Sequence, residues 1–263
     1  MTSLLLLLAS LSFAQTPAAS PAPDKPKLAV VIDDFGLTYP KDQPDEDWMA
    51  LKFPMTFAVM PVSPRTAKMA QRTKESGHEL IIHFPFDKYL SLKLPKDAVD
   101  PEDLKKVDAL LAKAFAQIPD AKGLNNHQSY RGTMNRPMME AFMKRVKGKV
   151  GFFLDSRVSS KSVAYEEAKK AGIPAAMNGI FLDGTAETKN RRKGGAALEA
   201  GIEQDKALCE HYLRIAANSA KKHGHAVAIG HHYYHGTYRC LVEELPKIQK
   251  DGVELVFASA IAN

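Results

Sequence analysis

The sequence predicts an α/β protein, a β/α barrel of seven to eight strand–helix units, and three observations carry this prediction. Short β-rich apolar runs alternate with amphipathic helical stretches along the 263 residues. The strand-like runs are almost continuously apolar, as parallel strands covered on both faces must be. About eight such units favour a closed or nearly closed barrel over an open doubly wound sheet. A chain with 45% hydrophobic and 25% charged residues suits one large domain, which we expect to span residues 28–263.

Each predicted strand is a short run rich in aliphatic and aromatic residues. The runs occupy residues 28–34, 55–61, 78–84, 122–127, 150–156, 175–183, 226–231 and 253–259. Helices are predicted between most of them, at residues 64–76, 101–117, 136–147, 162–171, 196–222 and 237–250. In the second helix, Leu104, Val107, Leu111 and Phe115 recur at helical spacing and form one apolar face. Pro246 predicts a kink or break inside the last helix.

Most of the predicted strands end in residues that bind metals or transfer protons. These residues are Asp33 and Asp34, His83, His127, Asp155, Asp183, and His231 with His232. The carboxyl ends of the strands in a β/α barrel form one face, so side chains that are distant in sequence converge there around one cavity. The pattern therefore predicts a functional site at that face.

The aspartates have a structural alternative, because an Asp after a strand often caps the next helix or makes a turn. For Asp155 and Asp183 the sequence leaves both roles open. Asp33 and Asp34 indicate function more strongly, since adjacent carboxylates at the end of a buried strand repel one another unless a cation or a donor lies between them.

The histidines fall into three groups. His83 and His127 directly follow strand-like runs, which favours metal ligation. The segment at residues 230–237, G-H-H-Y-Y-H-G-T, gathers imidazole and phenol groups beyond an apolar strand, and we expect a functional role for it. Its alternative is a metal-chelating surface cluster without catalytic purpose. The remaining histidines that we expect to be structural are His78, His211, His223 and His225.

Several other functions fit the sequence poorly. It contains no glycine-rich nucleotide-binding motif, no G-x-S-x-G nucleophile motif and no C-x-x-C pair. The net charge of +6 comes from scattered lysines and arginines without a basic block and interleaved aromatic residues, so we expect no nucleic-acid partner. The charge is consistent with a general attraction to anionic surfaces such as a cell envelope.

The first residues are typical of an export signal. The apolar run within residues 1–14 ends with small Ser12 and Ala14, which predicts a signal peptide and an exported protein, periplasmic or secreted. The run is too short for an ordinary membrane span, so we expect none after cleavage. Because Met1-Thr2-Ser3 lacks a basic residue, an uncleaved or misassigned start is the alternative. Residues 15–27 are rich in Pro and Ala and predict an extended linker.

The chain has two cysteines, Cys209 and Cys240. An oxidising compartment permits a disulfide between them, but two buried free thiols fit the sequence equally well.

Ordered motifs along the chain resemble those of the divergent polysaccharide deacetylase family, a distant branch of the polysaccharide deacetylases. The motifs are I-D-D-F-G at 32–36, G-H-E-L-I-I-H-F-P-F at 77–86, G-L-N-N-H at 123–127, F-F-L-D-S at 152–156, F-L-D at 181–183 and I-G-H at 229–231. The resemblance covers residues 28–259. It implies a distorted β/α barrel, a divalent metal that is commonly zinc, and a polysaccharide or peptidoglycan-like glycan as substrate.

By this resemblance, Asp33 corresponds to a general base and Asp34 to a metal ligand. His83 matches the first histidine of the superfamily's metal motif. Asp87 stands where classical members place a second ligating histidine, so His127 is the third ligand that the divergent branch suggests.

The resemblance also assigns a proton donor. His231 resembles the late-motif histidine that acts as general acid, and Asp155 is a candidate for holding an active-site partner. The supporting residues are then Asp155, Asp183, Asp87 and His232.

The expected function is an exported metal-dependent hydrolase that N-deacetylates an amino-sugar polysaccharide through a metal-activated water. One alternative is a catalytically inactive envelope binding or scaffolding protein on the same fold. Another is a zinc hydrolase that acts on a different ester or amide. Tyr233, Tyr234 and Trp48 are candidates for stacking on sugar rings, or for simple packing.

Overall fold

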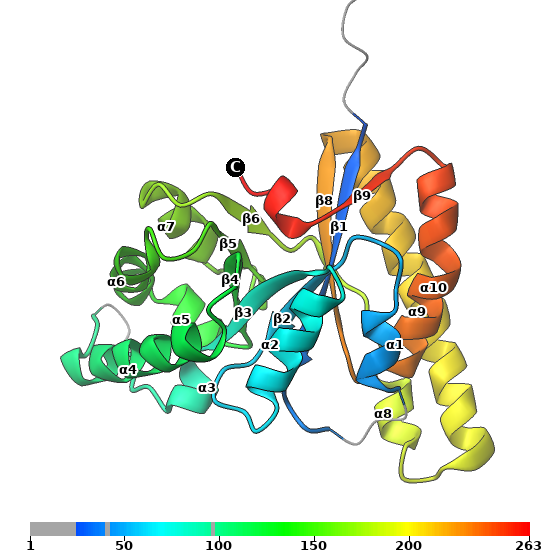
Figure 1. The fold of residues 1–263 in the computed structure, drawn as a ribbon, viewed down its shortest axis with the longest axis horizontal. Helices are drawn as coiled ribbons and strands as arrows, with labels where there is room; N and C mark the ends of the chain where they lie inside the picture. Colours follow the sequence, from blue (N-terminus) through cyan, green and yellow to red (C-terminus); the bar gives the residue numbers. More distant parts are fainter. Residues whose placement is uncertain (1–24, 40–42, 96–97) are drawn as a thin grey trace, which may run out of the picture.

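The computed structural model describes residues 25–39, 43–95 and 98–263, which form a parallel sheet curled into a distorted β/α barrel, as predicted (Figure 1). The predicted signal peptide and most of the predicted linker lie outside these residues. The strands are β1 (Lys27–Phe35), β2 (Thr56–Val59), β3 (Glu79–Pro85), β4 (Gly123–His127), β5 (Phe152–Asp155), β6 (Ala175–Met177), β7 (Ile180–Phe181), β8 (His225–His231) and β9 (Glu254–Val256). Their order is β6-β5-β4-β3-β2-β1-β8-β7, and β9 pairs with the start of β1.

The sheet is buried on both faces, which explains its continuous apolar strands. Along β1, Leu28 and Val30 pack toward the helices, whereas Ala29 and Val31 belong to the cluster that fills the barrel interior. All four side chains are at most 1% exposed. Alternate residues of a strand point to opposite faces, so this pattern follows directly from the sheet's position between two apolar layers.

The six predicted helices are present with small shifts at their ends. The helices are α1 (Asp45–Met49), α2 (Thr66–Glu75), α3 (Asp87–Leu90), α4 (Pro101–Gln117), α5 (Tyr130–Met134), α6 (Arg136–Val146), α7 (Ala164–Lys170), α8 (Ala186–Asn190), α9 (Gly195–His223), α10 (His235–Lys250) and the 3-10 turn η1 (Ala258–Ala260). Helix α4 has its predicted bounds, because the Asp100 side chain accepts a hydrogen bond from the Glu102 N–H at 2.9 Å and Pro101 occupies the first helical position.

Of the kink or break predicted at Pro246, the break does not occur, since α10 continues to Lys250. Pro246 lies on the exposed side of the helix, and so does Val242, whose carbonyl the proline leaves without its helical donor. Water can reach that carbonyl, which lowers the cost of the proline.

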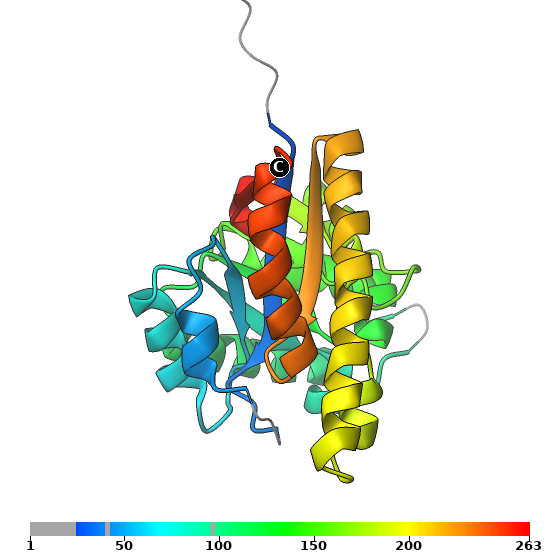
Figure 2. The same cartoon turned by 90° about the vertical axis from the view of Figure 1, so that its right-hand side faces the viewer.

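Helices α9 and α10 lie side by side, and α9 packs against β8 (Figure 2). Cys209 of α9 and Cys240 of α10 form a disulfide, which decides between the two alternatives that the sequence left open. None of the described helices is long and apolar enough to cross a membrane.

The prediction of one strand over residues 175–183 is wrong. The run divides into β6 and β7, which lie at opposite ends of the strand order. Asn178 and Gly179 connect the two strands. The Asn178 N–H donates to the Asp155 carbonyl at 2.8 Å, and the Gly179 N–H donates to the Val227 carbonyl at 3.0 Å. A Cβ on Gly179 would lie 3.2 Å from that Val227 oxygen, so glycine suits this close crossing.

Candidate functional site

The carboxyl ends of β1, β3, β4 and β8 surround a cavity of about 190 Å³. The residues expected to carry the chemistry all line this cavity, namely Asp33, Asp34, His83, His127 and His231. Residues from four separate strands therefore converge as the barrel prediction requires.

A local irregularity in β1 places both adjacent aspartates at the cavity. Successive side chains of a regular strand point to opposite faces. Here the register of β1 against β2 shifts between Ile32 and Phe35, and Asp34 has a left-handed backbone with φ 73°. A bulge of this kind turns a side chain away from its regular direction, which brings Asp34 to the same cavity as Asp33. Backbone strain at a non-glycine residue is typical of functional sites.

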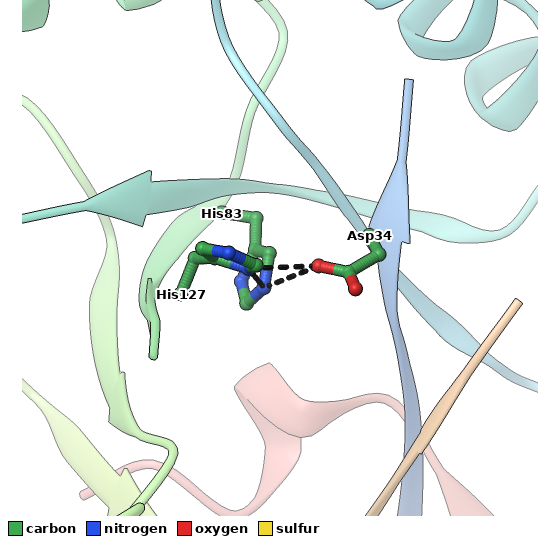
Figure 3. A group of neighbouring side chains, drawn as sticks. All are labelled: Asp34, His83 and His127. Carbon is green, nitrogen blue, oxygen red and sulfur yellow. Dashed lines mark hydrogen bonds and ion pairs between the residues drawn. The ribbon is translucent and has the colours of Figure 1, made fainter. Parts of the chain in front are cut away.

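Asp34, His83 and His127 bring three donor atoms together (Figure 3). Asp34 Oδ1 lies 3.2 Å from His83 Nε2 and 2.8 Å from His127 Nδ1, and the two ring nitrogens are 3.0 Å apart. All three side chains are at most 3% exposed.

This donor set fits a divalent metal. Tetrahedral zinc, with bonds of about 2.0–2.2 Å, holds neighbouring ligand atoms about 3.3 Å apart. The observed separations of 2.8, 3.0 and 3.2 Å need to widen by only a few tenths of an ångström. One carboxylate and two imidazoles are a ligand set that catalytic zinc sites use, and three protein ligands leave a position open.

Asn125 connects the candidate ligands to Asp33. Its Nδ2 donates to Asp33 Oδ1 at 2.9 Å, and its Oδ1 lies 2.8 Å from His83 Nδ1. Since an amide oxygen only accepts, His83 Nδ1 carries a proton in this contact, which leaves Nε2 as the ring nitrogen that faces Asp34 and could bind a metal. Asn125 and His83 are direct partners across β3 and β4, so strand register sets this arrangement.

The environment separates the two neighbouring aspartates in acidity. Burial raises the pKa of Asp33, against the opposing influence of His83, His231 and the Asn125 hydrogen bond. Burial acts in the same direction on Asp34, but interactions with His127 and His83 outweigh it and hold the pKa of Asp34 well below the usual carboxyl value. Asp34 is therefore suited to bind a cation, and Asp33 is the better proton acceptor of the pair.

The two histidines shift in opposite directions. Burial lowers the pKa of His127. Burial also disfavours the charged form of His83, but the negative charges of Asp33 and Asp34 outweigh it and raise the pKa of His83.

His231 and Asp183 form the second part of the site. His231 Nδ1 lies 2.6 Å from Asp183 Oδ2, and Asp183 Oδ1 accepts from the Thr237 hydroxyl at 2.7 Å. Burial opposes protonation of His231, but the charge and hydrogen bond of Asp183, together with the charges of Asp34 and Asp33, outweigh it and raise the pKa of His231 to about 10. A Cβ on Gly230 would lie 3.0 Å from Thr237 Cγ2, so the absence of a side chain there lets α10 approach β8 closely.

Asp155 and His232 lie outside the lining of this cavity. The Asp155 carboxylate accepts from the Arg157 N–H at 2.8 Å and the Ser162 hydroxyl at 2.7 Å, which is the turn-forming role that the sequence left open. The His232 ring is fully buried and stacks on Phe35 with centroids 4.9 Å apart.

Two other candidates also lie away from the metal ligands. Asp87 borders a neighbouring cavity and accepts the Arg131 N–H at 3.1 Å. Trp48 is fully buried and donates its Nε1–H to the His232 carbonyl at 2.9 Å, so a sugar-stacking role for this ring is wrong. Tyr233 does line the cavity of the candidate ligands, together with Tyr39, and the two tyrosine rings are 4.4 Å apart.

Two residues of the site, Asn125 and Tyr39, were not predicted from the sequence. Asn125 stands two residues before His127 on the same strand, and this spacing puts both side chains on one face. That alternation was a usable signal. Tyr39 follows β1 in an irregular segment, where no periodicity indicates its position.

Comparisons with known proteins identify relatives in sequence and in fold. YibQ, an uncharacterized protein of Escherichia coli K12, is 28% identical over 238 residues, which are 90% of this chain and 67% of that protein. The uncharacterized protein ATU2773 of Agrobacterium tumefaciens has a similar solved structure, with a TM-score of 0.71, 18% identity, and coverage of 93% of this chain and 92% of that one. The polysaccharide deacetylase Bc1974 of Bacillus cereus shares the fold with a TM-score of 0.52, 12% identity, and coverage of 89% and 92%.

The family model described as divergent polysaccharide deacetylase matches residues 30–262, which include every strand end that contributes to the cavity. The chain therefore belongs to the divergent polysaccharide deacetylase family.

Proposed function

We propose that this protein is a metal-dependent hydrolase that removes acetyl groups from the amino sugars of a polysaccharide or peptidoglycan-like glycan. The observation that carries the proposal is that one cavity gathers three kinds of group. These are the three possible metal donors, the separate buried carboxylate of Asp33, and His231, which Asp183 holds. Family membership supports the choice of an N-acetylated glycan.

Asp34, His83 and His127 are the residues that would hold the metal. Zinc matches one carboxylate and two imidazoles best, and when bound it lowers the pKa of water and polarises an acyl carbonyl. Asn125 fixes the orientation of His83, as hydrogen-bond partners of metal-ligating histidines generally do.

Asp33 and His231 divide the proton transfers. Asp33 Oδ2 lies 3.7 Å from His83 Nε2, close to the donors but outside the three-atom cluster, so it is free to accept the proton of the attacking water. His231, held protonated by Asp183, donates a proton to the amine as it leaves the acyl carbon. General acid–base groups of this kind typically contribute about 10²–10⁴-fold each.

We further propose that the protein is exported to the periplasm or secreted. The pattern of residues 1–14 supports this location, and so does the disulfide between Cys209 and Cys240, because disulfides persist mainly in oxidising compartments.

The test is acetate release from N-acetylated glycans by the purified, zinc-loaded chain, together with its metal content. We expect one metal per chain and acetate release, both lost in His127→Ala and both retained in His211→Ala, which alters an exposed histidine of α9. A stably folded chain that binds metal and glycan without releasing acetate would instead support the inactive binding protein.

A further inference from the structure

A second cavity adjoins the one that holds the candidate metal ligands. It has a volume of about 480 Å³ and is formed by residues of α3 and α5 and of the segments that join them to the rest of the fold. Gln128 lines both cavities, so they are neighbours at the same face of the barrel. The cavity at the metal ligands measures about 190 Å³, below the roughly 300–1,000 Å³ of sites that enclose a whole small ligand. A larger ligand bound there must extend beyond it.

Asp87 gives the second cavity a buried carboxylate. Asp87 is 6% exposed, and its Oδ2 accepts a hydrogen bond from the Arg131 backbone N–H at 3.1 Å. Its Oδ1 is buried and has no hydrogen-bond partner among the described residues. A buried carboxylate oxygen without a donor is unfavourable, so this position suits a ligand that brings a hydroxyl group.

Tyr130 and Arg131 add an apolar face and hydrogen-bond donors to the same cavity. Tyr130 is 51% exposed, so one side of its ring is accessible to a ligand. The Arg131 side chain is 63% exposed, and its Nε lies 3.8 Å from Asp87 Oδ2, beyond hydrogen-bonding distance. A ring face beside a carboxylate and a guanidinium suits a sugar, which has apolar C–H faces and hydroxyl groups around its edge.

Left-handed backbone residues and side-chain hydrogen bonds shape the wall of this cavity. Ser91, Gln128 and Ser129 all have left-handed backbones, with φ of 51°, 49° and 65°. The Ser129 hydroxyl accepts the Phe86 N–H at 2.8 Å and donates to the His127 carbonyl. These hydrogen bonds tie the wall to the end of β3 and to a candidate metal ligand, so the wall joins the two cavities.

We propose that this cavity is a second sugar-binding subsite, which holds the glycan unit adjacent to the one whose acetyl group enters the metal-site cavity. The inference rests on the proposed function, because it assigns the ligand as the same glycan chain. Asp87 accepts a hydroxyl hydrogen bond, Tyr130 packs against the ring, and Arg131 donates to its edge.

The test is isothermal titration of N-acetylglucosamine and its β-1,4-linked oligomers of two to five units into the zinc-loaded full chain. The Asp33→Asn background prevents turnover during the titration. We expect affinity to rise from one unit to two or more, and Tyr130→Ala and Asp87→Ala each to reduce oligomer affinity roughly three- to tenfold without changing single-unit binding. Ile215→Ala on α9, with 43% exposure, is the matched surface control.

Equal affinity for all lengths, absence of oligomer binding, or unchanged affinities in both variants would overturn the subsite. A parallel acetate assay on the chain with Asp33 intact separates this failure from failure of the proposed function. Acetate release that is independent of length and of both substitutions contradicts only the subsite. Length-dependent binding that both substitutions weaken, without acetate release, supports the subsite and contradicts the deacetylase.

Discussion

The two ends of the barrel hold cavities that differ in size and in chemistry. The cavity at the amino ends of the strands is the larger, at about 680 Å³, and Glu79, Lys74 and Asp120 in its lining have partners within the fold. Glu79 there accepts from the Thr56 hydroxyl at 2.8 Å and the Ser259 N–H at 3.1 Å, and Lys74 pairs with Asp120 at 2.8 Å. The cavity at the carboxyl ends measures about 190 Å³ and gathers the candidate ligands, base and acid.

The difference shows that volume alone does not locate chemistry in this fold. At the amino end, hydrogen bonds to Glu79 fix the C-terminal segment, and the polar groups stabilise the structure. At the carboxyl end, Asp34 adopts a left-handed backbone and His127 Nε2 is buried without a hydrogen-bond partner among the described residues. His78 Nε2 at the amino end is also buried without a hydrogen-bond partner among the described residues. The carboxyl end differs because it combines such an atom with a strained aspartate and three clustered donor atoms, and this combination indicates where a ligand supplies the missing interactions.

Asp33→Asn gives the largest expected effect at the carboxyl end. The amide keeps the size of the side chain but cannot take a proton, so turnover should fall roughly 10²–10⁴-fold while metal content stays constant. Steady-state acetate release and atomic absorption measure the two quantities. Turnover at the wild-type rate would remove Asp33 from the mechanism.

Asp183→Asn should shift the alkaline limit of turnover. His231 titrates near pH 10 in the folded protein against 6.5 ordinarily, so its charge pair stabilises the fold fully below about pH 6.5 and loses this contribution as pH rises toward 10. Without the carboxylate charge the pKa of His231 should fall, and turnover at pH 8 should drop roughly tenfold. A pH–rate profile checks this, with Thr237→Val as the milder control. An unchanged alkaline limb would contradict the role of Asp183.

Asn125 variants should separate metal binding from turnover. Asn125→Leu removes the acceptor for His83 Nδ1, and we expect metal affinity to fall roughly 10–100-fold. Asn125→Asp keeps an acceptor for His83 but sets a negative charge against Asp33, so it should retain metal and lose turnover. Competition with a metal chelator gives the affinities. Wild-type metal affinity and turnover in both variants would show that the Asn125 side chain contributes only to packing.

Glu79→Ala should affect stability at the amino end and leave the chemistry intact. It removes the acceptor for Thr56 and Ser259 and should lower the free energy of unfolding by about 1–3 kcal/mol. Urea denaturation measures the loss, and metal affinity and turnover of the folded variant should match wild type. Loss of metal binding in this variant would break the proposed separation between the two ends.

The strand ends were predictable from the sequence because parallel strands share one carboxyl edge. That rule and the family resemblance together predicted that Asp34, His83 and His127 form one metal site. It could not tell which of two aspartates accompanies His231. Asp155 and Asp183 both follow strand-like runs, and the outcome depends on the closure of the barrel, which places β7 rather than β5 beside β8.

The remaining gaps have a similar physical cause. The division of residues 175–183 into β6 and β7 depends on hydrogen bonds from Asn178 and Gly179 to opposite edges of the sheet, and these edges are distant in sequence. The contact of Asn125 with His83 depends on the pairing of these two residues across β3 and β4. Local periodicity contains neither kind of information, whereas it sufficed for α4, whose capping residue and apolar face lie within its own segment.

The most direct test of the metal centre is X-ray absorption at the zinc edge on the stoichiometrically loaded chain. The account predicts one zinc per chain with a first shell of two imidazole nitrogens and oxygen ligands at about 2.0–2.2 Å, and loss of one imidazole in His127→Ala. A chain that binds no stoichiometric metal, or a shell unchanged by His127→Ala, would contradict the assignment of Asp34, His83 and His127 as the metal site.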